Sequence, residues 1–113
     1  MKKTLLTVLL AAFAKFTFAT FATDFTATDC ASTSHNLFTE LAAGKVVVIT
    51  WVMPCGACIT GASNASNAVI AVGNPNVVFY LVDDAGNTNC SSLNSWASTN
   101  SITTMPALAT PEI

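Results

Sequence analysis

The strongest hydrophobic pattern is an unbroken run of mostly β-branched residues over positions 46–52, Val-Val-Val-Ile-Thr-Trp-Val. Apolar residues follow one another here instead of alternating with polar ones, which predicts a central β-strand covered on both faces. A second apolar run, Val77 to Val82, predicts another buried strand. The turn-forming sequence Gly73-Asn74-Pro75-Asn76 comes directly before it and marks where that strand begins.

Between these two runs the pattern changes to a helical period. Apolar or small residues recur there at steps of three and four, which predicts a helix with one narrow apolar stripe: Cys58, Ala62, Ala65, Val69 and Val72. Its serine and asparagine content gives a weak intrinsic helix propensity, so packing on a sheet must stabilise it. Strand, helix and strand in this order predict a βαβ unit with parallel strands and a right-handed crossover.

Shorter helices are predicted on either side of this unit. Residues 34–43 have Leu37, Phe38 and Leu41 at helical spacing, with Ser34 or Asn36 as N-cap and Gly44 as the stop signal. After the second strand, the spacing of Leu93, Trp96 and Ile102 predicts another short helix and its exit. Residues 23–30 have little periodicity and are expected to form an extended arm.

The first residues have the pattern of a secretory leader. Met1-Lys2-Lys3 provides a positive start, Leu5 to Phe13 is almost continuously apolar, and small residues such as Ala22 follow where a signal peptidase could cut. The apolar run is too short to span a bilayer, which disfavours a retained anchor. We therefore expect a signal peptide at residues 1–22 and one exported domain, periplasmic or secreted, at residues 23–113.

Removing such a leader changes the charge balance. The four basic residues of the chain are lysines, and three of them lie in the leader, so Lys45 alone would face six acidic residues and give a net charge of about −5. Nucleic acid and anionic membranes bind through clustered basic residues. We therefore expect neither as a partner of the mature chain.

The main candidate chemistry is Cys55-Gly56-Ala57-Cys58, which lies between the first predicted strand and the long helix. Two thiols with this spacing at a strand-to-helix turn indicate redox chemistry. If Cys55 starts the helix, unpaired backbone N–H groups and the positive end of the helix dipole stabilise its thiolate and lower its pKa. Only the thiolate attacks disulfides efficiently.

These residues resemble the thioredoxin superfamily, in which a buried strand and a tryptophan precede Cys-X-X-Cys and a long helix. The resemblance covers residues 34–106 and includes Trp51-Val52-Met53-Pro54 before the thiols. It implies a three-layer α/β/α fold around the parallel βαβ unit. It also implies an exported thiol–disulfide oxidoreductase in which Cys55 attacks and Cys58 resolves, with protein or peptide disulfides as substrates and a redox partner protein.

Several positions depart from the family pattern. Ile49 stands where many thioredoxins have a buried acid, Pro54 where tryptophan is frequent, and Ala57 where proline or histidine is usual, so the direction of electron flow stays open. Residues 101–106 resemble the approach to the family's cis-proline, with Pro106 as its candidate. Only Ala107 to Ile113 follow, so the C-terminal hairpin and helix of the family are expected to be missing and the domain C-terminally truncated.

The remaining cysteines, Cys30 and Cys90, have no chemical neighbours in the sequence, and a structural disulfide between them is the preferred interpretation in an exported domain. An alternative is a zinc site that uses all four cysteines, although zinc ribbons usually supply two Cys-X-X-Cys pairs. The preferred interpretation implies no organic cofactor and no metal. A second alternative function is a non-catalytic binding or surface module in which Cys55 and Cys58 form a structural disulfide.

Other candidate residues have ordinary structural explanations. Trp51 and Trp96 are expected in the core or at its edge, with the stronger functional interpretation for Trp51 because it belongs to the motif. His35 is expected to be a surface or capping residue. Asp83 and Asp84 end the second strand at its carboxyl edge, where α/β proteins commonly bind their ligands, but the two residues are expected in a solvated turn.

Overall fold

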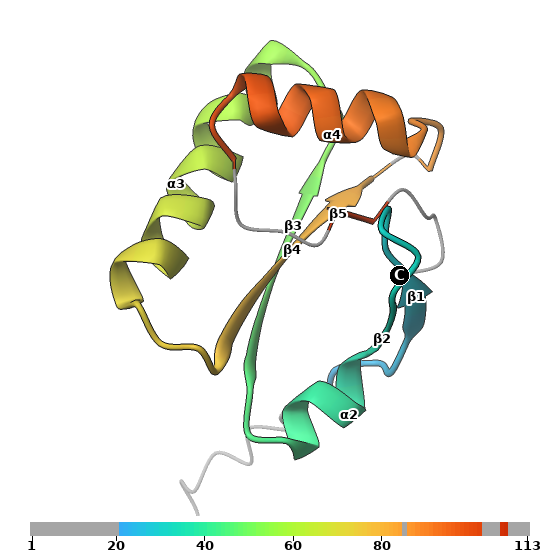
Figure 1. Ribbon diagram of the computed structural model, residues 1–113, viewed down its shortest axis with the longest axis vertical. Helices are drawn as coiled ribbons and strands as arrows, with labels where there is room; N and C mark the ends of the chain where they lie inside the picture. The colour runs from blue at the N-terminus through green and yellow to red at the C-terminus, as the bar shows by residue number, and fades with distance from the viewer. Residues whose placement is uncertain (1–20, 85, 103–106, 109–113) are drawn as a thin grey trace, which may run out of the picture.

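The computed structural model describes residues 21–84, 86–102 and 107–108 (Figure 1). The leader as far as residue 20, and Pro106, lie outside the described residues. The elements in chain order are β1 Thr26–Thr28, β2 Ser34–Asn36, α2 Leu37–Ala42, β3 Val46–Val52, α3 Gly56–Val72, β4 Val77–Asp83, α4 Cys90–Thr99 and β5 Ala107–Leu108. Both predicted long strands, the long helix and the later short helix are therefore present.

A parallel sheet with the strand order β3-β4-β5 organises the fold. β3 pairs with β4 from Val46 opposite Val77 to Val52 opposite Asp83, which confirms the predicted parallel pair joined by a helix. The prediction that residues 46–52 form the central strand is wrong for the described sheet. β4 lies in the middle and β3 at an edge, because the short β5 pairs with the far side of β4.

The main core lies between the sheet and the two longer helices. Phe79 and Leu81 of β4 are fully buried and pack with Ala62 of α3 and with Leu93 and Ala97 of α4. Figure 1 shows α3 on the side of the sheet away from β1 and β2, and α4 shares its core with α3. Apolar side chains from two helices thus cover this face of β4, which explains why its residues are more deeply buried than those of β3.

The other face of the sheet is covered differently from the expected α/β/α layers. Tyr80 and Val82 pack there against Ala27 of β1, with Phe25 and Ile49 at the margin. β1 and β2 form an antiparallel pair, so residues 26–28 are not simply an extended arm. In the described chain, this face therefore carries a β-hairpin and the short α2 in place of a full helical layer.

Helix boundaries follow local capping. Of the two N-cap candidates for the first helix, Asn36 is the cap: its side chain accepts a hydrogen bond of 2.8 Å from the Thr39 N–H, while Ser34 lies in β2. Gly73 ends α3 in the left-handed conformation, φ +60°, which glycine adopts without steric cost. Val72, expected on the buried stripe, is instead 61% exposed because it lies in the last turn of α3, outside the core contacts.

Within the described ranges, no helix combines the length and the apolar character that crossing a bilayer requires. The longest described helix is α3, with 17 residues.

Candidate functional site

The two motif cysteines lie where β3 turns into α3. Cys55 is the N-cap residue of α3, in an extended conformation with φ −141° and ψ 171°, and Gly56 begins the helix. Cys58 lies on the first turn, so one helical turn brings the two sulfur atoms to 3.9 Å from each other. Both cysteines are free thiols, as close as a sulfur hydrogen bond requires.

The pKa of the Cys55 thiol lies below its usual range. The backbone N–H groups of Ala57 and Cys58 are the main causes, because they stabilise the thiolate, and the Cys58 thiol adds a hydrogen bond. No acidic residue lies in the first turn of α3 to oppose this stabilisation.

The two thiols differ in their access to solvent. Cys55 is exposed, whereas Cys58 is half-buried and packs against the core cluster beneath α3. The Cys55 sulfur is therefore the more accessible of the two. The exposed Cys55 sulfur also has a lowered pKa, so it is both accessible and more readily ionised than an ordinary thiol.

Basic side chains do not contribute to this electrostatic environment. Lys45 is the one lysine or arginine in the described ranges, and it pairs with Glu40. It precedes β3, whereas Cys55 follows that strand, and a seven-residue strand spans about 23 Å. The lowered pKa of Cys55 therefore comes from backbone dipoles and the neighbouring thiol.

Ile49 and Trp51 project on the face of β3 opposite to α3. Ile49 packs with Phe25 and Tyr80 on the hairpin side, so this position faces away from Cys58. Trp51 is 49% exposed and, with Ile49 and Leu37, lines an apolar cavity of about 290 Å³. Trp51 thus lies outside the described core clusters, and the expectation of a core or core-edge position is wrong for this residue.

Asp83 is more deeply buried than its sequence context predicts. It was expected in a solvated turn, yet it is 1% exposed, while Asp84 is exposed. Strand alternation puts its side chain on the same face as Leu81, opposite Val52 at the carboxyl edge. One carboxylate oxygen accepts the Thr88 N–H at 2.8 Å, and the other has no hydrogen-bond partner in the structure.

The other two cysteines form a disulfide. Cys30, after β1, is bonded to Cys90 at the start of α4, at a sequence separation of 60. These sulfurs are consumed in a covalent bond, which removes them as thiolate ligands and overturns the four-cysteine zinc alternative. The disulfide links the hairpin to the helix that covers the opposite face of the sheet.

His35 is not the surface or capping residue that was expected. Its Nε2 lies 2.8 Å from an Asp29 carboxylate oxygen, and its Nδ1 lies 3.4 Å from the Tyr80 hydroxyl. The Glu40 carboxylate lies 3.8 Å from Nδ1. His35 therefore belongs to a polar network beneath the hairpin, on the face of the sheet away from α3.

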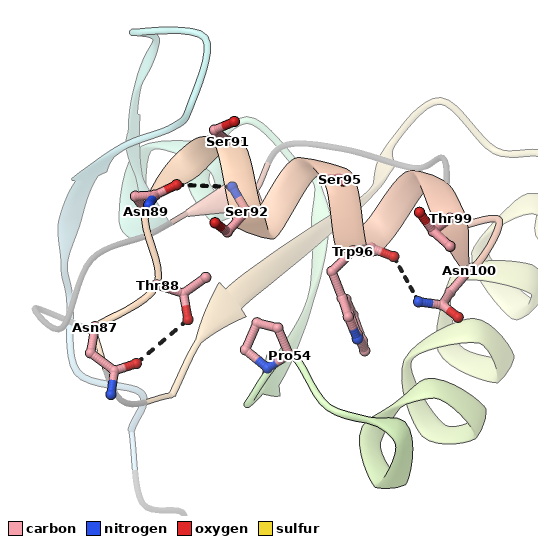
Figure 2. A pocket seen from close by; sticks show the side chains of 10 residues that line it. All are labelled: Pro54, Asn87, Thr88, Asn89, Ser91, Ser92, Ser95, Trp96, Thr99 and Asn100. Carbon is pink, nitrogen blue, oxygen red and sulfur yellow. Dashed lines mark hydrogen bonds between the residues drawn. The ribbon is translucent and has the colours of Figure 1, made fainter.

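A polar groove lies next to the thiol turn, along α4. Pro54, which directly precedes Cys55, forms one wall, and Trp96 projects from α4 toward the same space (Figure 2). The groove encloses about 730 Å³. Trp96 also packs against the core, which agrees with its expected place at the core edge.

Comparisons of the chain with protein-family models, curated proteins and solved structures give no match. The assignment of chemistry therefore depends on the geometry around Cys55.

Proposed function

We propose that this protein is an exported, thioredoxin-like thiol–disulfide oxidoreductase acting on protein or peptide disulfides. The observation that carries the proposal is the asymmetry of the thiol pair: Cys55 is exposed at the start of α3 with a lowered pKa, and Cys58 is half-buried 3.9 Å away. An attacking and a resolving thiol require this combination.

The proposed thiol–disulfide exchange needs no bound cofactor. The Cys55 thiolate attacks one substrate sulfur, forms a mixed disulfide and displaces the other substrate sulfur as a thiolate, which takes up a proton. Cys58 loses its proton and attacks the Cys55 sulfur, releasing the second substrate thiol. The substrate gains two electrons, the Cys55–Cys58 pair becomes a disulfide, and a dithiol redox partner reduces it again. The reverse sequence oxidises a substrate dithiol.

The leader pattern supports export, and so does the Cys30–Cys90 disulfide, because disulfides persist in oxidising compartments. The Cys55–Cys58 pair would then work in the periplasm or outside the cell. The thioredoxin-like assignment is supported by the parallel β3-α3-β4 unit with the dithiol at the turn after its first strand.

A reduction assay tests the proposal. The full chain is given insulin and dithiothreitol, and turbidity from the released insulin chains is followed beside Cys55→Ser and Cys58→Ser. We expect the wild type to accelerate the reaction and Cys55→Ser to lose the acceleration, since the attacking sulfur is gone. Cys58→Ser should retain one attack and accumulate a mixed disulfide that mass spectrometry detects. Equal rates for wild type and Cys55→Ser would overturn the proposal.

The second candidate is a non-catalytic module whose Cys55–Cys58 disulfide is structural. It is favoured by one observation: Ile49 supplies no acid and faces away from Cys58, so that position offers no group to deprotonate the resolving thiol. Alkylation rates measured against pH separate the candidates. A Cys55 pKa equal to that of free cysteine, together with a disulfide that resists dithiothreitol, would favour the structural module.

A further inference from the structure

The groove beside Pro54 has an unusual lining for a site next to a nucleophile. None of its residues is charged, and nearly all carry a hydroxyl or an amide: Pro54, Asn87, Thr88, Asn89, Ser91, Ser92, Ser95, Trp96, Thr99 and Asn100. Figure 2 shows them along α4 and the loop before it, with Pro54 facing the helix. The lining offers many neutral hydrogen-bonding groups and two apolar rings.

The polar lining follows from the amphipathic sequence of α4, which has one apolar and one polar face. Leu93 and Ala97 point into the core, which turns Ser92, Ser95 and Thr99 outward at helical spacing. Two asparagines are tied to the backbone at the ends of the groove. Asn89 accepts the Ser92 N–H at 2.9 Å, and the Asn100 amide donates to the Trp96 carbonyl at 2.7 Å (Figure 2).

The serine hydroxyls in the groove are available for a ligand. Among the described residues, the hydroxyls of Ser91, Ser92 and Ser95 have no hydrogen-bond partner within the protein. Each can donate one hydrogen bond and accept others. Backbone N–H and C=O groups of an extended chain need such partners when they leave water.

The size of the groove fits a short extended segment. From Asn89 to Asn100, α4 and its caps span about 16 Å at the helical rise, which matches about five residues of an extended chain. Pro54 lines the groove and is bonded to Cys55, so a segment lying along α4 runs close to the attacking sulfur.

We propose that this groove, named here the α4 groove, binds an uncharged, extended polypeptide segment that flanks the target disulfide. The inference rests on the proposed function and deepens it by assigning the substrate class. A charged flank would lose its hydration without meeting an opposite charge, because the lining holds none. Substrates with serine-, asparagine- or glycine-rich flanks are therefore preferred over substrates with aspartate or lysine flanks.

The test compares two positions on one helix. Ser95→Arg fills the groove with a long charged side chain, whereas Ser98→Arg makes the same change at an exposed α4 position outside the groove lining. Each full-length variant is assayed with a disulfide peptide whose flanks are serine and asparagine, with an aspartate-flanked version, and with the small aromatic disulfide dithiobis-nitrobenzoate.

We expect Ser95→Arg to lower kcat/KM for the neutral peptide about tenfold, mainly through KM, which corresponds to losing one or two hydrogen bonds. Its rate with the small disulfide should match wild type, and so should the rates of Ser98→Arg with the neutral peptide and with the small disulfide. Three results would overturn the α4 groove as the substrate site. Ser95→Arg could leave the neutral-peptide rate unchanged, or lower it no more than the rate with the small disulfide. Wild type could also act equally fast on the neutral and the aspartate-flanked peptides.

A binding measurement separates this inference from the proposed chemistry. A cysteine-free version of the neutral peptide is titrated calorimetrically against Cys55→Ala, which cannot react. Binding that Ser95→Arg abolishes supports the groove even if disulfide exchange fails in the insulin assay. No binding of the peptide, or tighter binding of a neutral oligosaccharide such as maltohexaose, would refute the peptide assignment.

Discussion

Removing the Cys30–Cys90 disulfide tests how the two faces of the sheet are joined. The bond closes a loop with a sequence separation of 60, between the strand β1 on one face and the helix α4 on the other. Loop-closure entropy for such a separation gives a stabilisation of about 4 kcal/mol at 25 °C. Small domains are typically stable by about 5–15 kcal/mol, so this single bond accounts for a large share of the total.

The assay is urea unfolding monitored by far-ultraviolet circular dichroism, and it compares two variants. The first carries Cys55→Ala and Cys58→Ala, so that no free thiol is left to exchange with the disulfide. The second carries these two changes together with Cys30→Ala and Cys90→Ala. We expect the four-alanine protein to lose about 4 kcal/mol of unfolding free energy and to show a larger urea dependence, because its unfolded chain is less compact.

Dithiothreitol supplies a matched control for this comparison. It should lower the stability of the two-alanine protein to that of the four-alanine protein and leave the latter unchanged. A loss below about 1 kcal/mol would refute the reasoning, since it would mean that the unfolded state gains little freedom from cutting the bond.

Three further predictions concern the core and the ionisable groups. Phe79→Ala should lower the free energy of unfolding in urea by about 3–5 kcal/mol, because Phe79 is fully buried under α3 and α4. The control Val72→Ala, at an exposed position, should change it by less than about 0.5 kcal/mol. Equal losses in the two variants would contradict the assigned core. Burial raises the pKa of Tyr80 to about 12, with Glu40 adding to the shift, so this single tyrosine should form phenolate near that pH in an absorbance titration of the folded protein. Because the folded pKa is the higher one, the stabilising contribution is complete below about pH 10 and is lost as the pH rises toward 12; a midpoint near 10 in folded protein would contradict the burial. The pKa of Asp24 is lowered by the Phe38 N–H and the Asn36 side chain, so its contribution is present above its unfolded pKa of about 4 and is lost as the pH falls through the lower folded value. As the pH is lowered from 6, the free energy of unfolding should fall less steeply for Asp24→Asn than for wild type. Parallel curves for the two proteins would argue against the hydrogen bond between Asp24 and the Phe38 N–H.

The candidate site could be predicted as far as its local chemistry. The apolar run before Cys55 and the helical spacing after it put the first cysteine at a helix start, and one helical turn then determines how close Cys58 must lie. Backbone N–H groups at that start lower the thiol pKa whatever surrounds them. These features involve neighbours in sequence, so the pattern of residues predicts them.

Positions whose burial depends on how separate segments pack were predicted less well. Asp83 has the sequence context of a solvated turn, yet its side chain is buried and accepts a hydrogen bond from the Thr88 N–H. His35 resembles a surface residue until the hairpin brings it to Asp29 and Tyr80. The apolar run of β3 is as hydrophobic as that of β4, and only the pairing of β5 with the far side of β4 decides which strand is central.

The sequence by itself determined the two parallel strands, the helix between them and the thiol pair at its start, because strand and helix periods and capping act over a few residues. Tertiary structure decided which faces the helices cover, which strand lies inside, and that the hydroxyl-rich side of α4 meets Pro54 beside Cys55. Those outcomes depend on how separate segments bury each other's apolar surface, and no local pattern encodes that choice.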